Sequence, residues 1–201
     1  MQRQRLRGCR QLSQLRSINM NEPHTWFRAR ELTPRKVVCH IGPTNSGKTY
    51  TAIKSLEEAK SGIYCGPLRL LAWEIYEKLR QGSRVCALLT GQEAVLPQGH
   101  THVSCTVEMT DLKGKYDVAV IDEAQLLGDV GRGWAWTNAF LGLMASEIHV
   151  CGSKSMLPVI TRLCEKTGDK LTVHEYKRLS PLTVSPLALS SLSQVFHKLK
   201  P

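Results

Sequence analysis

A glycine-rich stretch at residues 42–49 constrains the fold of this chain more than any other feature. Its sequence, GPTNSGKT, matches the phosphate-loop pattern G-x-x-x-x-G-K-[ST] at every position. A short apolar run with two adjacent valines precedes it at residues 36–41, as in a buried strand. Residues 50–60 follow without Gly or Pro, with Ile53 and Leu56 at helical spacing. A glycine-rich turn that matches by chance is the alternative, and the order of strand, loop and helix argues against it.

The loop offers donors and charge to an anion. Its backbone N–H groups and the start of the following helix carry partial positive charge. Lys48 adds a full charge for the β- and γ-phosphates, and the Thr49 hydroxyl is placed to hold Mg²⁺. We therefore expect a nucleoside triphosphate with Mg²⁺ as the ligand of this loop; the family resemblance described below makes the nucleotide ATP. The residues expected to bind the nucleotide are Gly42, Pro43, Thr44, Asn45, Ser46, Gly47, Lys48 and Thr49.

Two adjacent carboxylates follow a continuous β-branched run at residues 116–121. We expect Asp122 to leave the end of this strand and to hold Mg²⁺ together with Thr49. Glu123 can accept a proton from an attacking water molecule. An acid pair that only begins a helix is the alternative. Because acids at both positions favour hydrolysis over binding alone, Lys48, Asp122 and Glu123 are candidate catalytic residues.

The rest of the chain alternates between strand-like and helix-like segments. Strands are expected at residues 36–41, 62–67, 85–89, 102–107, 116–121, 147–151 and 171–176. Helices are expected at residues 50–60, 68–80, 134–144 and 156–165, and a loop at residues 94–101. This alternation predicts an α/β fold, a doubly wound parallel sheet with helices on both faces and its ligand at the carboxyl ends of the strands.

Charge and cysteine usage bear on compartment and partners. The formal net charge is +10, and residues 1–21 contain five arginines, no acid and an apolar residue at every third position from Leu6 to Ile18. This pattern predicts a mitochondrial transit peptide, with a disordered basic arm as the alternative. No apolar run approaches the roughly 20 residues of a membrane span, so we expect no membrane partner. The seven scattered cysteines include no C-x-x-C pair, which favours reduced thiols and no zinc.

Further motifs carry a resemblance to a known family. Residues 122–125, DEAQ, resemble the D-E-x-[HDQ] box of superfamily 2 helicases, and residues 66–72, GPLRLLA, resemble their P-x-R-x-L-A motif. Over about residues 23–185 the chain is similar to mitochondrial ATP-dependent RNA helicases of the Suv-three family, including stretches such as HIGPTNSGKTYTAI and YDVAVIDEAQLL. The resemblance implies a P-loop NTPase of RecA-like fold that hydrolyses ATP and binds RNA. It also implies the mitochondrial matrix and a 3′-exoribonuclease of the RNA degradosome as partner.

The resemblance assigns roles to residues outside the phosphate loop. It adds Gln125 to the catalytic residues, and it implies that Gln125, Gly152 and Ser153 couple the nucleotide state to movement of the strand. RNA contacts are implied at Pro67, Arg69, Thr90, Gly91, Thr106 and Glu108. Contacts of this kind give affinity that falls with salt and little sequence preference. For Gln125, Ser153, Thr90 and Thr106 a structural cap or turn role is the alternative.

The resemblance also divides the chain. Residues 22–178 would form the first RecA-like domain, and residues 179–201 a linker toward a second RecA-like domain that this sequence does not include. That domain would supply an arginine finger, which contributes about 10³–10⁵ in rate. We therefore expect the polypeptide alone to bind ATP weakly, to hydrolyse it slowly and not to unwind RNA. A P-loop kinase similar to thymidine kinases, which also pair such a loop with D-E-A-Q, and a non-catalytic nucleotide- or RNA-binding fragment are the alternatives.

Overall fold

The computed structural model of the chain describes residues 22–27 and 34–180. The expected transit peptide at 1–21 and most of the expected linker lie outside these ranges. The strands are β1 Lys36–Ile41, β2 Gly62–Gly66, β3 Cys86–Leu89, β4 Ala94–Val95, β5 His102–Thr106, β6 Lys115–Ile121, β7 Met144–Gly152 and β8 Lys170–Glu175. The α-helices are α2 Lys48–Glu58, α3 Arg69–Gln81, α4 Gly133–Gly142 and α5 Leu157–Thr167. Short 3₁₀ turns are η1 Pro23–Trp26, η2 Val107–Met109, η3 Ala124–Gly128 and η4 Lys154–Met156.

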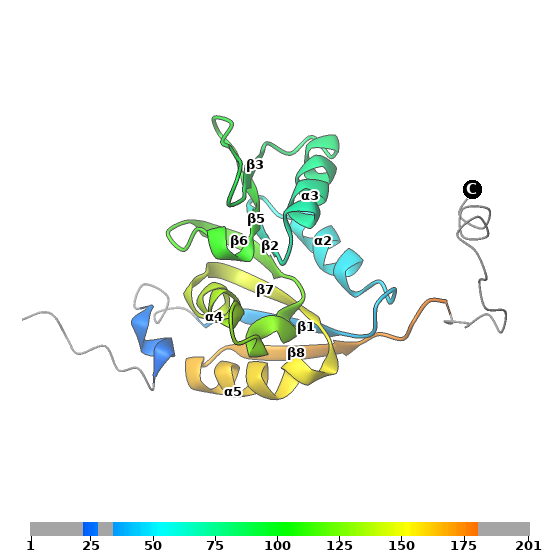
Figure 1. Cartoon of the computed structure of the whole chain (residues 1–201), viewed down its shortest axis with the longest axis vertical. Helices are drawn as coiled ribbons and strands as arrows, with labels where there is room; N and C mark the ends of the chain where they lie inside the picture. Colours follow the sequence, from blue (N-terminus) through cyan, green and yellow to red (C-terminus); the bar gives the residue numbers. More distant parts are fainter. Residues whose placement is uncertain (1–21, 28–33, 181–201) are drawn as a thin grey trace, which may run out of the picture.

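All eight strands join one sheet in the order β4-β3-β5-β2-β6-β7-β1-β8 (Figure 1). Every pairing except that of β3 with β4 is parallel, which confirms the predicted parallel arrangement. The expected loop at 94–101 is wrong at its first two residues, because β4 adds an antiparallel edge strand. The reversal comes from a tight turn in which Thr90 N donates to Glu93 O at 2.8 Å. The sheet is therefore mixed.

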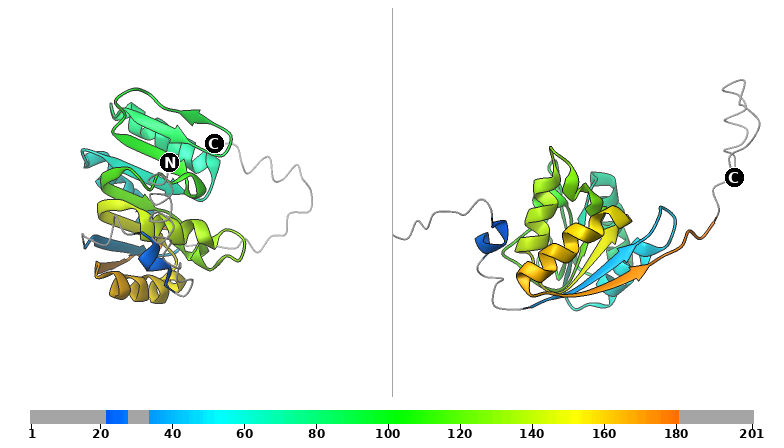
Figure 2. Two further views of the ribbon diagram at one scale, coloured as in Figure 1. Left: turned by 90° about the vertical axis from the view of Figure 1, so that its left-hand side faces the viewer. Right: turned by 90° about the horizontal axis from the view of Figure 1, so that it is seen from below.

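Helices cover both faces of the sheet, as predicted (Figure 2). On one face α2 and α3 bury side chains such as Leu56 and Leu79 against Tyr64 of β2. On the other face Trp136 and Phe140 of α4 and inward residues of α5 pack on the opposite side chains of the same strands. Alternate residues of each parallel strand thus serve two separate cores, which is why these strands read as continuous apolar runs.

The junction of α4 and β7 differs from the expected helix at 134–144. The helix ends at Gly142, and Met144 already belongs to β7. Arg35 causes this early end, because its Nη1 donates to Phe140 O at 2.8 Å and to Leu143 O at 3.0 Å. The same guanidinium forms a buried ion pair of 2.8 Å with Asp169. A long-range partner thus satisfies carbonyls that a further helical turn would have used.

The two ends of the sheet have different roles. Phe27 packs at the amino end, where a Cβ on Gly142 would approach its ring to 2.8 Å, so this aromatic residue supports the domain edge. The phosphate loop lies at the other end, where β1 gives way to α2. The six cysteines of the described ranges are all buried. Among the helices of those ranges, none combines the length and the apolar character needed to cross a bilayer.

Candidate nucleotide-binding site

The loop between β1 and α2 has the backbone conformation of a phosphate cradle. Gly47 precedes the first helical residue with a φ of 77°, in the left-handed region that glycine adopts most readily. Asn45 also has a positive φ, 58°, a conformation in which Asn is enriched among non-glycine residues. At the base of the loop a Cβ on Gly42 would lie 2.7 Å from Ser46 Oγ. Glycine is therefore required at both ends of this turn.

Polar atoms in the loop fit an anionic ligand. The Lys48 side chain is almost fully buried, and its Nζ donates to Pro43 O at 3.3 Å. Ser46 Oγ is also buried and has no hydrogen-bond partner among the described residues. An ammonium group with spare donors and an unpaired hydroxyl at a helix N-terminus match the needs of a phosphate chain. The residues present therefore fit a nucleoside triphosphate.

Asp122 lies opposite this loop, at the end of β6. Its side chain is 4% exposed, and its two oxygens accept hydrogen bonds from Thr49 Oγ1 at 3.3 Å and from Tyr64 OH at 3.1 Å. The backbone is held as well, because Trp136 Nε1 donates to Asp122 O at 2.9 Å. Burial, and then the nearby Glu123 carboxylate, raise the pKa of Asp122. Burial disfavours the ionised form of this carboxylate, and a bound divalent cation would offset that cost. The carboxylate and the neighbouring hydroxyl therefore fit a divalent cation.

Two hydrogen bonds made by Gln125 lead from Glu123 to the residue that follows β7. Glu123 has a φ of 49°, a left-handed conformation that is uncommon for a non-glycine residue. Gln125 Nε2 donates to Glu123 Oε2, and Gln125 Oε1 accepts from Ser153 N at 3.1 Å. Gly152 leaves room for this amide, since a Cβ there would lie 2.6 Å from Gln125 Oε1. The structure thus brings together Glu123, Gln125, Gly152 and Ser153.

The residues expected to contact RNA lie along the same edge of the sheet. β3, β5 and β2 are neighbours, Gly66 pairs with Thr106, and Leu89 pairs with Cys105. The residues that follow these strands, including Pro67 and Thr90, therefore lie side by side at the same edge of the sheet. Arg69 is exposed at the start of α3, and Gly91 is exposed in the turn after β3.

Three of these residues, Pro67, Thr90 and Glu108, already have partners within the protein. Thr90 is 5% exposed, and its Oγ1 accepts from Glu93 N at 3.1 Å, so the hydroxyl stabilises its own turn. Glu108 forms an ion pair with Arg132 Nη2 at 2.7 Å. The same Nη2 donates to Pro67 O at 2.7 Å.

Sequence reasoning missed Tyr64, Trp136 and Arg132. Tyr64 and Trp136 reach Asp122 from β2 and α4, and Arg132 joins Glu108 to Pro67. No local motif marks these three residues, because each acts on a segment distant in the sequence. The only signal available was their position next to elements that carry motifs.

Residues 23–176 match the family described as the DEXQ-box helicase domain of Suv3. The chain is 49% identical over 173 residues to the DExH-box ATP-dependent RNA helicase DExH16, mitochondrial, of Arabidopsis thaliana, covering 86% of this chain and 30% of the relative. It is 47% identical over 186 residues to the ATP-dependent RNA helicase SUPV3L1, mitochondrial, of Homo sapiens, covering 90% of this chain and 24% of the relative. The chain thus spans only about a quarter to a third of the length of these relatives.

Solved structures show the same fold at low identity. A DEAD box protein from Methanococcus jannaschii superposes with a TM-score of 0.54 and 19% identity, covering 70% of this chain and 45% of that protein. The Dbp5 protein of S. cerevisiae, solved with Nup159 and Gle1, gives a TM-score of 0.50 and 17% identity, covering 85% of this chain and 51% of that protein. The RecA-like P-loop NTPase fold is therefore confirmed. With the family match over residues 23–176, the chain belongs to the family of the DEXQ-box helicase domain of Suv3.

Proposed function

We propose that residues 22–178 form the ATP-binding half of an RNA helicase, which binds Mg²⁺–ATP, hydrolyses it and contacts RNA at the carboxyl edge of its sheet. One observation carries the proposal. Lys48 and Thr49 begin α2, and Asp122 and Glu123 follow β6. The two segments meet at that edge, where Thr49 and Asp122 are joined by a hydrogen bond of 3.3 Å. The family match supports the same activity.

The chain's own residues divide the work of binding and hydrolysis. Lys48 and the N–H groups of the loop hold the phosphates, and Thr49 and Asp122 hold the cation. Mg²⁺, when bound, neutralises charge that develops on the transferred phosphoryl group. Glu123 lies next to Asp122, where its carboxylate can take a proton from the attacking water.

Gln125 is the connection between hydrolysis and movement. Its amide bridges Glu123 and the backbone of Ser153, so a displacement of Glu123 is passed to the segment after β7. Gly152 belongs to this connection, because the close approach of Gln125 leaves no space for a Cβ. We assign these residues a coupling role on this basis.

RNA binding rests on the edge formed by the ends of β2, β3 and β5. Arg69 is exposed there and belongs to the segment that resembles a backbone-binding motif. Thr106 and Gly91 lie at the ends of the neighbouring strand segments and offer further contacts to the sugar–phosphate backbone. Thr90 and Glu108 serve by shaping this edge, since their side chains are engaged within the protein.

Compartment and partners follow from the relatives. Their names place them in mitochondria, and the Arg-rich residues 1–21 agree with import. We extend this proposal to the matrix and to a 3′-exoribonuclease as partner. The family match does not favour the kinase alternative.

Nucleotide binding and ATP hydrolysis by the wild-type chain, Lys48→Ala and Glu123→Gln test the proposal. We expect Lys48→Ala to weaken Mg²⁺–ATP binding by at least about tenfold, because it removes the charge on the phosphates. Glu123→Gln should retain binding and lower turnover, because it removes the proton acceptor. Equal affinities and equal rates for all three proteins would exclude an ATP-hydrolysing site.

A further inference from the structure

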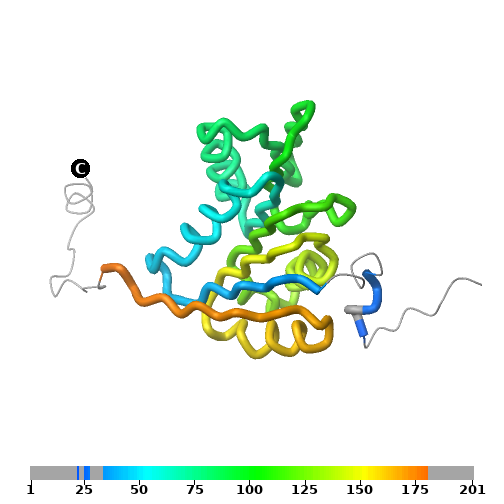
Figure 3. Tube along the Cα trace, turned by 180° about the vertical axis from the view of Figure 1, so that it is seen from behind, coloured from blue at the N-terminus to red at the C-terminus, as the bar shows by residue number. Residues whose placement is uncertain are grey.

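The segment that follows β8 runs along the phosphate loop. β8 pairs in parallel with β1, and Ile41 is level with Glu175, so the chain leaves both strands at the same height (Figure 3). Beyond that point Tyr176 N donates to Ile41 O at 2.7 Å and Leu179 N donates to Asn45 O at 2.9 Å. One backbone hydrogen bond therefore joins the segment Tyr176–Ser180 to the last residue of β1, and a second joins it to the phosphate loop at Asn45.

A side-chain contact extends this attachment. Asn45 Nδ2 donates to Ser180 Oγ at 2.8 Å. Asn45 is also the residue whose backbone has a left-handed conformation within the loop. The segment thus contacts the loop at its turning point.

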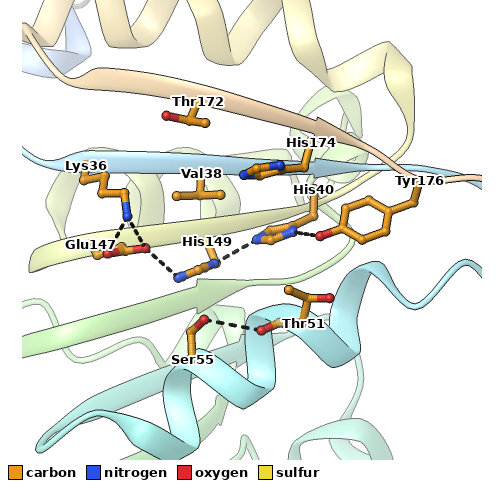
Figure 4. A pocket seen from close by; sticks show the side chains of 10 residues that line it. All are labelled: Lys36, Val38, His40, Thr51, Ser55, Glu147, His149, Thr172, His174 and Tyr176. Atoms are coloured by element: carbon orange, nitrogen blue, oxygen red, sulfur yellow. Dashed lines mark hydrogen bonds and ion pairs between the residues drawn. The ribbon is translucent and has the colours of Figure 1, made fainter.

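Tyr176, at the start of this segment, lines a pocket of about 470 Å³. Between α2 and the sheet, the Tyr176 hydroxyl lies 2.8 Å from His40 Nδ1, and His40 Nε2 lies 2.8 Å from His149 Nδ1 (Figure 4). His149 Nε2 in turn lies 3.1 Å from Glu147 Oε1. A neutral imidazole has one donor and one acceptor, so donation in one direction from Tyr176 through His40 to His149 satisfies both nitrogens of His40. Tyr176 is therefore held by groups from β1 and β7.

Arg178 is the only side chain of this segment that brings a guanidinium to the loop. Its Nη2 donates to Thr44 Oγ1 at 2.8 Å, and the residue is half-buried. Arg35, Arg80 and Arg132 each pair with a carboxylate. Within ranges 22–27 and 34–180, Arg178 has no such ion pair and contacts only a neutral hydroxyl.

A guanidinium has five N–H donors, and one contact to a hydroxyl leaves most of them free. Phosphate groups suit these donors, because their oxygens accept paired hydrogen bonds from the planar fork. The loop beneath Arg178 is the proposed site of a triphosphate. The charge of Arg178, the geometry of its donors and its position beside the loop are therefore all suited to contact with a phosphate group.

We propose that Arg178 contacts the phosphates of the bound nucleotide, as a second cation beside Lys48 that the segment Tyr176–Ser180 carries to the loop. The inference rests on the proposed nucleotide function and names a residue that no motif of the loop contains. On nucleotide binding, Arg178 moves its donors from Thr44 to phosphate oxygens. The gain in binding affinity is largest for the nucleotide with the most phosphate charge.

The test is the affinity of the 201-residue chain for ATP, ADP and adenosine, with Mg²⁺, at two salt concentrations. Arg178→Ala should weaken ATP binding by about tenfold, ADP binding by less and adenosine binding hardly at all. Lys177→Ala removes the same charge from an exposed neighbour, and it should bind all three ligands like the wild type. The ATP affinity of Arg178→Ala should also depend less steeply on salt than that of the wild type.

Arg178→Gln separates direct contact from a purely structural role. Glutamine keeps a side-chain amide that can donate to Thr44 but lacks the charge. Direct phosphate contact predicts the same loss as for alanine, and thermal unfolding without nucleotide reports whether each variant is folded. Near wild-type ATP affinity for Arg178→Gln would overturn the inference.

Lys48→Ala distinguishes the two proposals. If Lys48→Ala loses affinity while both Arg178 variants bind ATP like the wild type, the inference is wrong and the nucleotide site stands. If Lys48→Ala and the wild type bind ATP equally, the nucleotide function fails and the role of Arg178 fails with it.

Discussion

Thr49 Oγ1 donates a hydrogen bond of 3.3 Å to Asp122 Oδ1. The two residues are 73 positions apart, and they meet because β1 and β6 end at the same edge of the sheet. A hydroxyl and a carboxylate at this spacing supply two oxygen ligands of the kind that Mg²⁺ prefers. In the proposed site, this hydrogen bond would hold both ligands in place before a cation binds.

Asp122→Asn should separate stability from cation binding. The buried carboxylate has a raised pKa, so its charged form costs free energy in the folded protein, and the neutral amide removes that cost. We expect thermal unfolding of the nucleotide-free protein to shift upward by roughly 2–4 °C, the equivalent of about 1 kcal/mol. Stabilisation by Mg²⁺–ATP should disappear. Asp117→Asn, at an exposed position of the same strand, is the control, and equal Mg²⁺–ATP stabilisation of all three proteins would contradict the assignment.

Tyr64→Phe should change the pH dependence of cation binding. The Tyr64 hydroxyl donates to Asp122 Oδ2 at 3.1 Å, which favours the ionised carboxylate and opposes the rise of its pKa. Without this donor the pKa of Asp122 rises further, so Mg²⁺–nucleotide affinity should begin to fall at a higher pH. Titrations across the acidic range measure the shift. Tyr116→Phe, which removes a hydroxyl 3.4 Å from Asp111, should leave the profile unchanged, and an unshifted profile for Tyr64→Phe would count against the role of this hydroxyl.

Gly152→Ala should disconnect Gln125 from Ser153. The new Cβ would lie 2.6 Å from Gln125 Oε1 and 2.7 Å from Met156 Sδ, closer than real Cβ contacts allow. We expect ATP turnover to fall more than ATP affinity, because the change displaces the amide rather than the phosphate loop. Gly128→Ala is the matched control, because nothing lies within 4 Å of the position that its new Cβ would take. Identical kinetics for both variants would argue against a coupling role.

Acid should destabilise the domain through His40. Burial, followed by the effect of His149 and then of His174, lowers the pKa of His40 from 6.5 to about 4. Between these values the unfolded chain binds more protons than the folded one, so the free energy of unfolding falls as the pH drops from about 6.5 to about 4. The loss is on the order of 2–3 kcal/mol.

Urea unfolding at several pH values measures this loss. The charged and titratable groups that line the same pocket are Lys36, Glu147, His149, His174 and Tyr176. His40→Gln should flatten the curve over that interval, whereas His100→Gln, at an exposed position, should not. A curve for His40→Gln as steep as that of the wild type would assign the effect to another group.

Arg69→Ala should weaken RNA binding to a similar extent whatever the sequence of the RNA. Loss of one phosphate contact reduces the slope of log affinity against log salt by about 1. Arg162→Ala, also exposed but on α5, removes the same charge away from the proposed edge and should keep the wild-type slope. Fluorescence anisotropy with single-stranded RNA at three salt concentrations measures the slope for both variants. Equal slopes for Arg69→Ala and the wild type would contradict an RNA contact by Arg69.

Local patterns predicted the phosphate loop and the acid pair correctly in position. Residues 42–49 are contiguous, and strand, loop and helix follow one another without a long-range step. The helix start was less accurate, since α2 begins at Lys48 and the apolar pattern suggested residue 50. The first turn is set by Gly47 and by the loop geometry, which hydrophobic periodicity does not report.

Two errors had long-range causes or weak local signals. The helix expected to reach residue 144 ends at Gly142, because Arg35 takes carbonyls at its end. β4 was not predicted, because a strand of two residues is too short to show a hydrophobic periodicity. The roles of Pro67, Thr90 and Thr106 remain predictions, although the register of the strands places them at one edge.

The sequence by itself determined that this chain forms a phosphate loop on a mainly parallel α/β sheet with an acid pair at a strand end. These features depend on residue type and on short spacing, which the chain carries locally. Only the tertiary structure decided which groups surround the loop. Tyr64 meets Asp122 because β2 lies beside β6, and Arg178 meets Thr44 because β8 lies beside β1. Such neighbours follow from the packing of the whole sheet, since the order of its strands is a global property that no local periodicity encodes.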